Sequence, residues 1–121
     1  MAKKGVKSSF ATRRPYRALM AELGEGERVL DAVKGKVGNG VGFAVVTDER
    51  LIVVGQAVAA LSAESTVESY PLSSITGVVL DTSLRQATLT ISTDAMNVTV
   101  DNITAGSIRI TKTLRAVTDA R

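Results

Sequence analysis

The chain of 121 residues is 45% hydrophobic and 22% charged, which is typical of one globular domain and excludes a wholly disordered chain. It contains neither cysteine nor histidine, so disulfides, thiolate nucleophiles and the usual zinc, haem and iron–sulfur ligands are excluded. We expect no metal and no cofactor. No run reaches the roughly 18 apolar residues that cross a bilayer, and no signal peptide is recognisable. This favours a cytoplasmic protein or part of a particle assembled in the cytoplasm.

The formal net charge of +3 hides a strong asymmetry along the chain. Glu22 is the first acidic residue, and six basic residues precede it. The remaining hundred residues hold nine basic and twelve acidic side chains and therefore carry a net charge of −3. An acid-free basic segment can contact the phosphates of nucleic acid or anionic lipid, or an acidic protein surface. The candidate anion or partner contacts in this segment are Lys3, Lys4, Lys7, Arg13, Arg14 and Arg17.

The N-terminal segment divides into an arm and a short helix. The first dozen residues mix Lys, Ser and Gly without an apolar period, which is typical of a mobile terminus or of an arm that orders on binding. Apolar residues then recur at helical spacing, where Thr12 can cap, Pro15 suits the first turn and Gly24 ends the pattern. We therefore divide the chain into an arm with a short amphipathic helix, residues 1–23, and a domain, residues 24–121. The apolar helix positions are Tyr16, Leu19, Met20 and Leu23.

Seven runs with the alternation and β-branched content of strands follow the helix. Gly38-Asn39-Gly40 supplies the positive φ angles of a tight hairpin turn between the first two runs. Pro71 ends the fourth run, because proline donates no hydrogen bond to a sheet. The predicted strands are residues 28–36, 41–47, 51–54, 66–70, 76–80, 87–92 and 97–100.

The last predicted element is a helix that begins at a polar cap, Asn102 or Thr104, and ends at about residue 117. The order of one helix, seven strands and one helix lacks the strand–helix alternation of a parallel α/β fold and has too few helices for a bundle. A strongly curved antiparallel sheet capped by the terminal helix fits this order. The apolar stripe of the helix comprises Ile103, Ile110, Leu114 and Val117.

Four segments of this pattern carry a resemblance to a known family. They are GERVLDAVKGKVG, GFAVVTDERLIVVG, VESYPLSSITGVVLD and ATLTIS, followed by the capped helix. Together, over roughly residues 24 to 118, they resemble a bacterial pleckstrin-homology-like (PH-like) domain. The resemblance implies a mainly β (α+β) fold: a strongly bent antiparallel sheet, or partly open barrel, of about seven strands with a C-terminal capping helix. The short N-terminal helix lies outside it.

The matching motifs are explained by structure rather than by chemistry. TDERLI places Asp48 and Glu49 in a hairpin turn, where short polar side chains bond to the local backbone. YPLSSI ends a strand at Tyr70 and seats a turn or a single helical turn, so that Leu72 and Ile75 plug the barrel.

The glycine-rich segment 35–42 does not predict a phosphate cradle, because a strand rather than the start of a helix follows its glycines. We interpret these glycines as turn geometry. Lys34 and Lys36 are further candidate anion contacts, as the resemblance to lipid-binding members implies. Those members carry a basic pair on the second strand, where this chain has VGFA at 41–44, which argues against specific phosphoinositide binding.

No local motif groups acidic, hydroxyl or lysine side chains for catalysis, so we expect neither an enzyme nor a small-molecule substrate. The first hypothesis is a binding and assembly module, since open strand edges suit β-augmentation. The resemblance to ring-forming bacterial domains implies a homo-oligomer or another protein partner, as in a larger assembly such as a phage particle. The alternative is a peripheral adaptor that binds anionic membrane or nucleic acid through the basic arm. The candidate self-association contacts are Phe10, Tyr16, Leu19 and Met20.

Overall fold

The computed structural model describes residues 19–38, 40–56, 65–83 and 85–119. A helical turn at residues 19–22 comes first, and the seven predicted strands are confirmed with small shifts at their ends. The predicted caps of the N-terminal helix lie outside the described residues. The elements are β1 (Val29–Val37), β2 (Gly40–Thr47), β3 (Arg50–Gln56), β4 (Ser65–Pro71), the 3-10 turn η2 (Leu72–Ser74), β5 (Ile75–Asp81), β6 (Ala87–Thr93), β7 (Asn97–Ile103) and the helix α2 (Ser107–Asp119).

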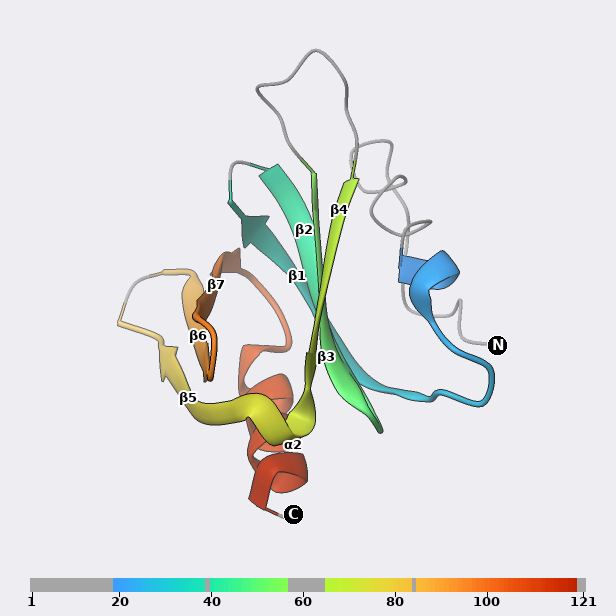
Figure 1. Ribbon diagram of the computed structural model, residues 1–121. Helices are drawn as coiled ribbons and strands as arrows, with labels where there is room; N and C mark the ends of the chain where they lie inside the picture. Colours follow the sequence, from blue (N-terminus) through green and yellow to red (C-terminus); the bar gives the residue numbers. More distant parts are fainter. Residues whose placement is uncertain (1–18, 39, 57–64, 84, 120–121) are drawn as a thin grey trace.

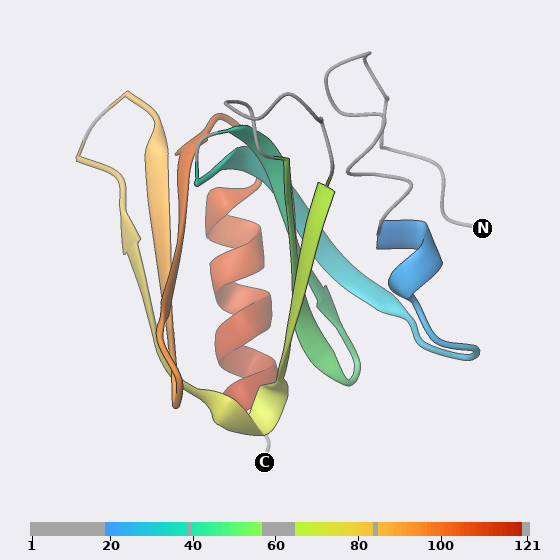
Figure 2. The same ribbon diagram turned by 45° about the horizontal axis from the view of Figure 1, so that its top comes forward.

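The strands form one antiparallel sheet in the order β4-β3-β2-β1-β7-β6-β5, which is not closed. β1 joins β7 through a single register pair, Lys36 with Asp101. The sheet bends at this pair into two halves, β1 to β4 and β5 to β7, and α2 lies between them (Figures 1 and 2). The predicted strongly bent, partly open barrel with a C-terminal helix is confirmed.

The larger hydrophobic cluster fills the space between the two halves and α2, and we call it the inner cluster. Strand alternation explains which side chains enter it: Ala87, Leu89 and Ile91 of β6 are buried, while the residues between them are only partly buried. The turn η2 directs the chain so that Ile75 is buried in the cluster and Leu72 packs against it. These two residues therefore plug the barrel as predicted.

β2 and β3 are buried on both faces. On the face turned away from α2, Phe43 and Val45 of β2 and Ile52 and Val54 of β3 form a second cluster with Leu19, the outer cluster. Leu19 comes from the N-terminal helical turn, which packs on this side of the sheet (Figure 1). Burial on both faces explains why these two strands have almost continuous apolar sequences.

A buried carboxylate fixes α2 to β1. The Asp31 side chain is 5% exposed and accepts hydrogen bonds from Nε of Arg109 at 3.0 and 3.1 Å. The Thr113 hydroxyl donates to the Arg109 carbonyl oxygen at 3.0 Å and lies 3.5 Å from the same carboxylate. One turn of the helix is thereby held at β1, while Ile110 and Leu114 enter the inner cluster.

The predicted start of α2 was wrong. The helix begins at Ser107, and the amide of Ile110 donates to the carbonyl oxygen of Gly106 at 3.0 Å, so neither Asn102 nor Thr104 caps it. Asn102 instead belongs to β7 and has a φ of 58°. Gly106 has a φ of 86°, a conformation that glycine adopts without steric cost, and it turns the chain from β7 into the helix.

The glycine-rich segment serves two purposes, of which sequence reasoning gave only the turn. Gly38 has a φ of 62° in the turn between β1 and β2. Gly35 and Gly42 instead lie opposite each other inside these strands. A Cβ atom on Gly35 would lie 2.5 Å from the carbonyl oxygen of Asp101, and one on Gly42 would overlap the carbonyl oxygen of Val54. Interpreting them as turn glycines was therefore wrong, because they allow neighbouring backbones to approach closely.

We predict that Gly35→Ala lowers the free energy of unfolding by about 3 kcal/mol, because the new methyl group must displace the backbone of β7. The matched control is Gly77→Ala in β5, where a Cβ atom would meet nothing closer than 3.9 Å. We expect the control to change stability by less than about 0.5 kcal/mol. Urea unfolding followed by circular dichroism measures both, and equal effects would contradict the close approach.

Candidate functional site

Arg50, at the start of β3, is the centre of a charged cluster. Its Nε and Nη2 donate to the two carboxylate oxygens of Glu27, each at 2.8 Å. Nη1 donates to the Glu22 carboxylate at 2.8 Å and to Ser69 Oγ at 3.1 Å, and Nη2 also donates to the Glu22 carbonyl oxygen at 2.8 Å. These bonds occupy all five N–H donors of the guanidinium group.

The carboxylate of Glu27 likewise has all its acceptor sites occupied, and its side chain is 1% exposed. Besides Arg50, it accepts hydrogen bonds from the Thr47 hydroxyl at 2.7 Å and from the Gly24 amide at 2.9 Å. The Arg50 hydrogen bonds are the main cause that lowers the pKa of Glu27 from 4.5 to about 2, against the opposing effect of burial. Because the donors of Arg50 and the acceptors of Glu27 are occupied, these two groups hold the surrounding segments together.

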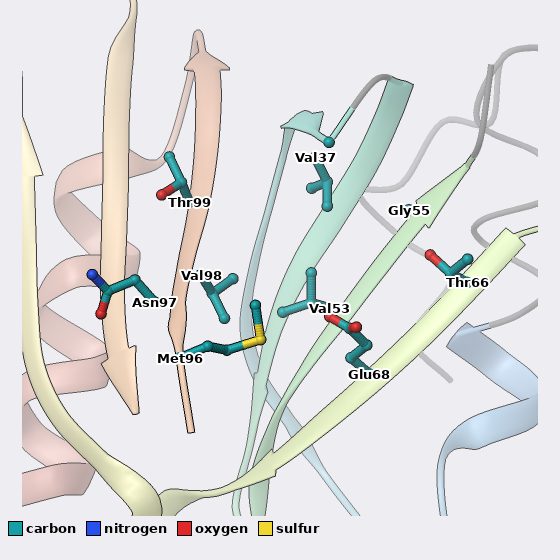
Figure 3. A pocket seen from close by; sticks show the side chains of 10 residues that line it. Val37, Val53, Gly55, Thr66, Glu68, Met96, Asn97, Val98 and Thr99 are labelled. Carbon is teal, nitrogen blue, oxygen red and sulfur yellow. The ribbon is translucent and has the colours of Figure 1, made fainter. Parts of the chain in front are cut away.

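A cleft of about 400 Å³ lies elsewhere, between the two halves of the sheet. It exists because the halves diverge from their single register pair and α2 fills only part of the space between them (Figure 2). Figure 3 shows side chains from β1, β3 and β4 facing those from the start of β7 and the turn before it. Its principal side chains are the apolar Val37, Val53, Met96 and Val98 and the polar Thr66 and Glu68.

The floor of the cleft is apolar and is kept open by a glycine. Val53 and Val98, 3% and 6% exposed, form this floor from opposite halves of the sheet. A Cβ atom on Gly55 would lie 3.2 Å from Val37 Cγ1 and 3.4 Å from Thr66 Oγ1. Any larger side chain at this position would therefore occupy the cleft.

A threonine turn positions Met96 at the rim. The Thr93 hydroxyl donates to the Met96 carbonyl oxygen at 2.7 Å and accepts from the amides of Ala95 and Met96 at 3.2 and 3.1 Å. Thr47 Oγ1 accepts from the amides of Glu49 and Arg50 in the same pattern. The turn holds the backbone of Met96 while its side chain, 52% exposed, extends into the gap (Figure 3).

One carboxylate stands beside this apolar surface. The Tyr70 hydroxyl donates to Glu68 at 3.0 Å and lies 3.7 Å from the sulfur of Met96. Burial, and then the bond to Glu68, raises the pKa of Tyr70, so the phenol remains a hydrogen-bond donor at neutral pH. The cleft therefore combines an apolar floor, an adaptable thioether and a negative charge. Among the described residues no group of three acidic side chains could hold a metal ion.

Comparison with known families agrees with this architecture. The family model described as bacterial PH domain matches residues 23–117. The chain belongs to this family. No curated protein matches it.

Solved structures share the fold of this PH domain at low sequence identity. A DUF1696 family protein with a pleckstrin-homology domain from Shewanella loihica PV-4 is 18% identical with a TM-score of 0.59, over 84% of this chain and 88% of that chain. The C-terminal domain of an unknown protein from Leishmania infantum is 15% identical with a TM-score of 0.57, over 88% and 93%. At these identities the likeness concerns the fold alone.

Of the predicted contact residues, the structure describes Leu19, Met20, Lys34 and Lys36, and these four do not line the cleft of this PH domain. Lys34 and Lys36 are exposed, and because Lys34 lies opposite Phe43, both belong to the face of the outer cluster. Leu19 is 6% exposed within that cluster, whereas the neighbouring Met20 is 37% exposed. The six basic arm residues, Phe10 and Tyr16 lie outside the described residues, and their contacts stay predictions. No described helix is long and apolar enough to cross a membrane.

Sequence reasoning missed the residues that form the cleft. Val53 and Val98 are indistinguishable from other core valines, because their neighbours across the cleft are distant in sequence. The one local signal was the likeness of TDAM, at 93–96, to TDER, at 47–50. It identifies a second threonine turn but not the cleft that the turn borders.

We predict a pH-dependent stability contribution from Glu27. Its folded pKa of about 2 lies below the ordinary 4.5, so its contribution is present above pH 4.5 and is lost as the pH falls toward 2. The free-energy gap between wild type and Glu27→Gln should therefore narrow by about 3 kcal/mol between pH 7 and pH 2. Urea unfolding across this range measures the gap. Glu25→Gln, at an exposed position, is the control, and a pH-independent gap for Glu27 would contradict the lowered pKa.

Proposed function

We propose that this PH domain is a non-catalytic protein-binding module whose cleft takes an extended segment of a partner. The observation that carries the proposal is a free strand edge beside an apolar cleft. Among the described residues β4 pairs with β3 alone, and Thr66 and Glu68 of β4 line the cleft. A segment paired with β4 would place every second side chain over the floor formed by Val53 and Val98.

The two edge strands of the sheet, β4 and β5, differ in how they are covered, which supports β4 as the binding edge. α2 packs along β5, and Arg115 donates to the carbonyl oxygen of Val78 in that strand at 3.2 Å. Such cover discourages strand addition. β4 has the cleft beside it instead, where added main-chain hydrogen bonds and a seated side chain would both contribute to affinity.

Chemistry of the cleft favours a protein over an anionic lipid. PH-like domains are in general protein-binding or lipid-binding modules, and lipid head groups bring negative charge. Glu68 would repel such a group, whereas Val53 and Val98 favour an apolar side chain. Met96 adapts its shape to different side chains, as methionine does at protein-binding surfaces. The cytoplasmic location and membership of a larger assembly stay predictions.

A random library of twelve-residue peptides displayed on phage, selected against the full chain, tests the proposal. We expect Met96→Lys and Gly55→Val each to lower the affinity for the selected peptides at least about tenfold, as hot-spot substitutions do. Val79→Lys, at a 62% exposed position of β5, should leave affinity unchanged. Fluorescence anisotropy gives the affinities and circular dichroism confirms folding. Peptides that bind the two cleft variants as tightly as wild type would refute the cleft as the site.

A further inference from the structure

We infer that the occupant of the cleft is the basic N-terminal segment, residues 1–18, of a second copy of this chain. The inference rests on the proposed function, since it names the partner of the same site. Three observations lead to it: the charge around the cleft, the side chains of the segment, and the place where the segment joins the domain.

The charges are complementary. Glu68 is the charged residue among the described side chains that line the cleft, and none of those side chains is basic. Asp94, two residues before Met96 in the turn that borders the cleft, is also acidic and exposed. Residues 22–121 carry −3, whereas the first 21 residues carry +6. A basic segment is therefore attracted both to the cleft and to the domain around it.

The segment also offers an apolar anchor. Phe10 is the largest side chain among the first fifteen residues, and Lys7 and Arg13 flank it at three residues on either side. Seated on the floor of the cleft, an aromatic ring would lie beside the thioether of Met96, a favourable pairing of sulfur and ring. In an extended segment the cations at three residues from Phe10 point away from the floor, where the net negative domain around the cleft attracts them. One short segment thus supplies both an apolar anchor and positive charge.

The attachment point of the segment favours a neighbouring copy. Leu19 packs into the outer cluster, on the face of the sheet opposite the cleft. Both ribbon views show the helical turn on the far side of β1 to β4 from the other half of the sheet (Figures 1 and 2). The twelve residues before the predicted helix, when extended, span up to about 40 Å, enough to reach an adjacent molecule. Each copy would then donate one segment and accept another, a head-to-tail contact that closes into rings or grows into filaments.

The absence of cysteine allows a direct test in the full chain. Ser8→Cys, which shares the face of Phe10 in an extended segment, is mixed in one preparation with Met96→Cys in another. Disulfide-linked heterodimers are measured by mass spectrometry under mild oxidation. The matched control partner is Ile108→Cys at the start of α2, which is 60% exposed against 52% for Met96. We expect the Met96 pair to form at least about tenfold faster, because docking raises the effective concentration of the two thiols. Replacing Lys7 and Arg13 by Gln should remove this preference.

The outcomes separate this inference from the proposed function. Equal rates for the Met96→Cys and Ile108→Cys partners would overturn the inference, while phage peptides that depend on the cleft would leave the proposed function standing. A disulfide confined to single chains of Ser8→Cys/Met96→Cys, at a rate independent of protein concentration, would show the segment in its own cleft and overturn the second copy. Failure of the phage peptides as well would overturn both.

Discussion

The ion pair between Arg50 and Glu27 is the constraint on which the placement of the first half of the fold depends. Its two residues are 23 positions apart, yet together they connect the last residue of the N-terminal helical turn, the segment before β1, the end of β2 and the edge strand β4. Removing both charges from water is costly, and the cost is offset here because each donor of Arg50 and each lone-pair site of Glu27 has a partner. Once Glu22 is fixed in this way, Leu19 lies over the outer cluster and completes it.

The cleft is a consequence of how the two halves of the sheet meet. Gly35 permits the backbone of β7 to approach β1, and the sheet bends where only one register pair joins these strands. Beyond that pair the halves diverge, and α2, held to β1 by Asp31 and Arg109, fills one part of the opening. The threonine turn at Thr93 sets the rim of what is left. Close approach of the strands at one point thus produces their separation at another, and this separation forms the cleft.

The strands could be predicted because each is specified by its own residues, through alternation, β-branched side chains and turn glycines. Glu27 and Arg50 appeared in the sequence only as members of separate motifs, since nothing local shows that a carboxylate and a guanidinium will meet. Gly35 resembles a turn glycine in sequence, and the atom that excludes a side chain there belongs to a strand more than sixty residues later. The start of α2 was misplaced for a related reason: polar residues favour caps in general, but Gly106 alone among the nearby residues suits the backbone that leaves β7. The cleft combines side chains from β1, β3, β4 and the start of β7, which local patterns in the sequence could not show to be neighbours.

An unclosed sheet has two edge strands, whose unpaired backbone groups can pair with another chain and cause aggregation. Proteins avoid this by covering the edge, or they use the edge to bind a partner. This chain covers one of them: α2 follows the last strand and returns along β5, where Arg115 bonds to its backbone. The helix cannot also cover β4, because Ile110 and Leu114 commit it to the space between the halves. On β4, Thr66 and Glu68 face the cleft beside its apolar floor. A buried core would not tolerate this combination, because a buried charge without a partner is costly. A segment that bears both an apolar and a basic side chain would suit it. Within the part of the chain that the structure describes, the helix that stabilises the barrel therefore covers the β5 edge and leaves β4 without such cover.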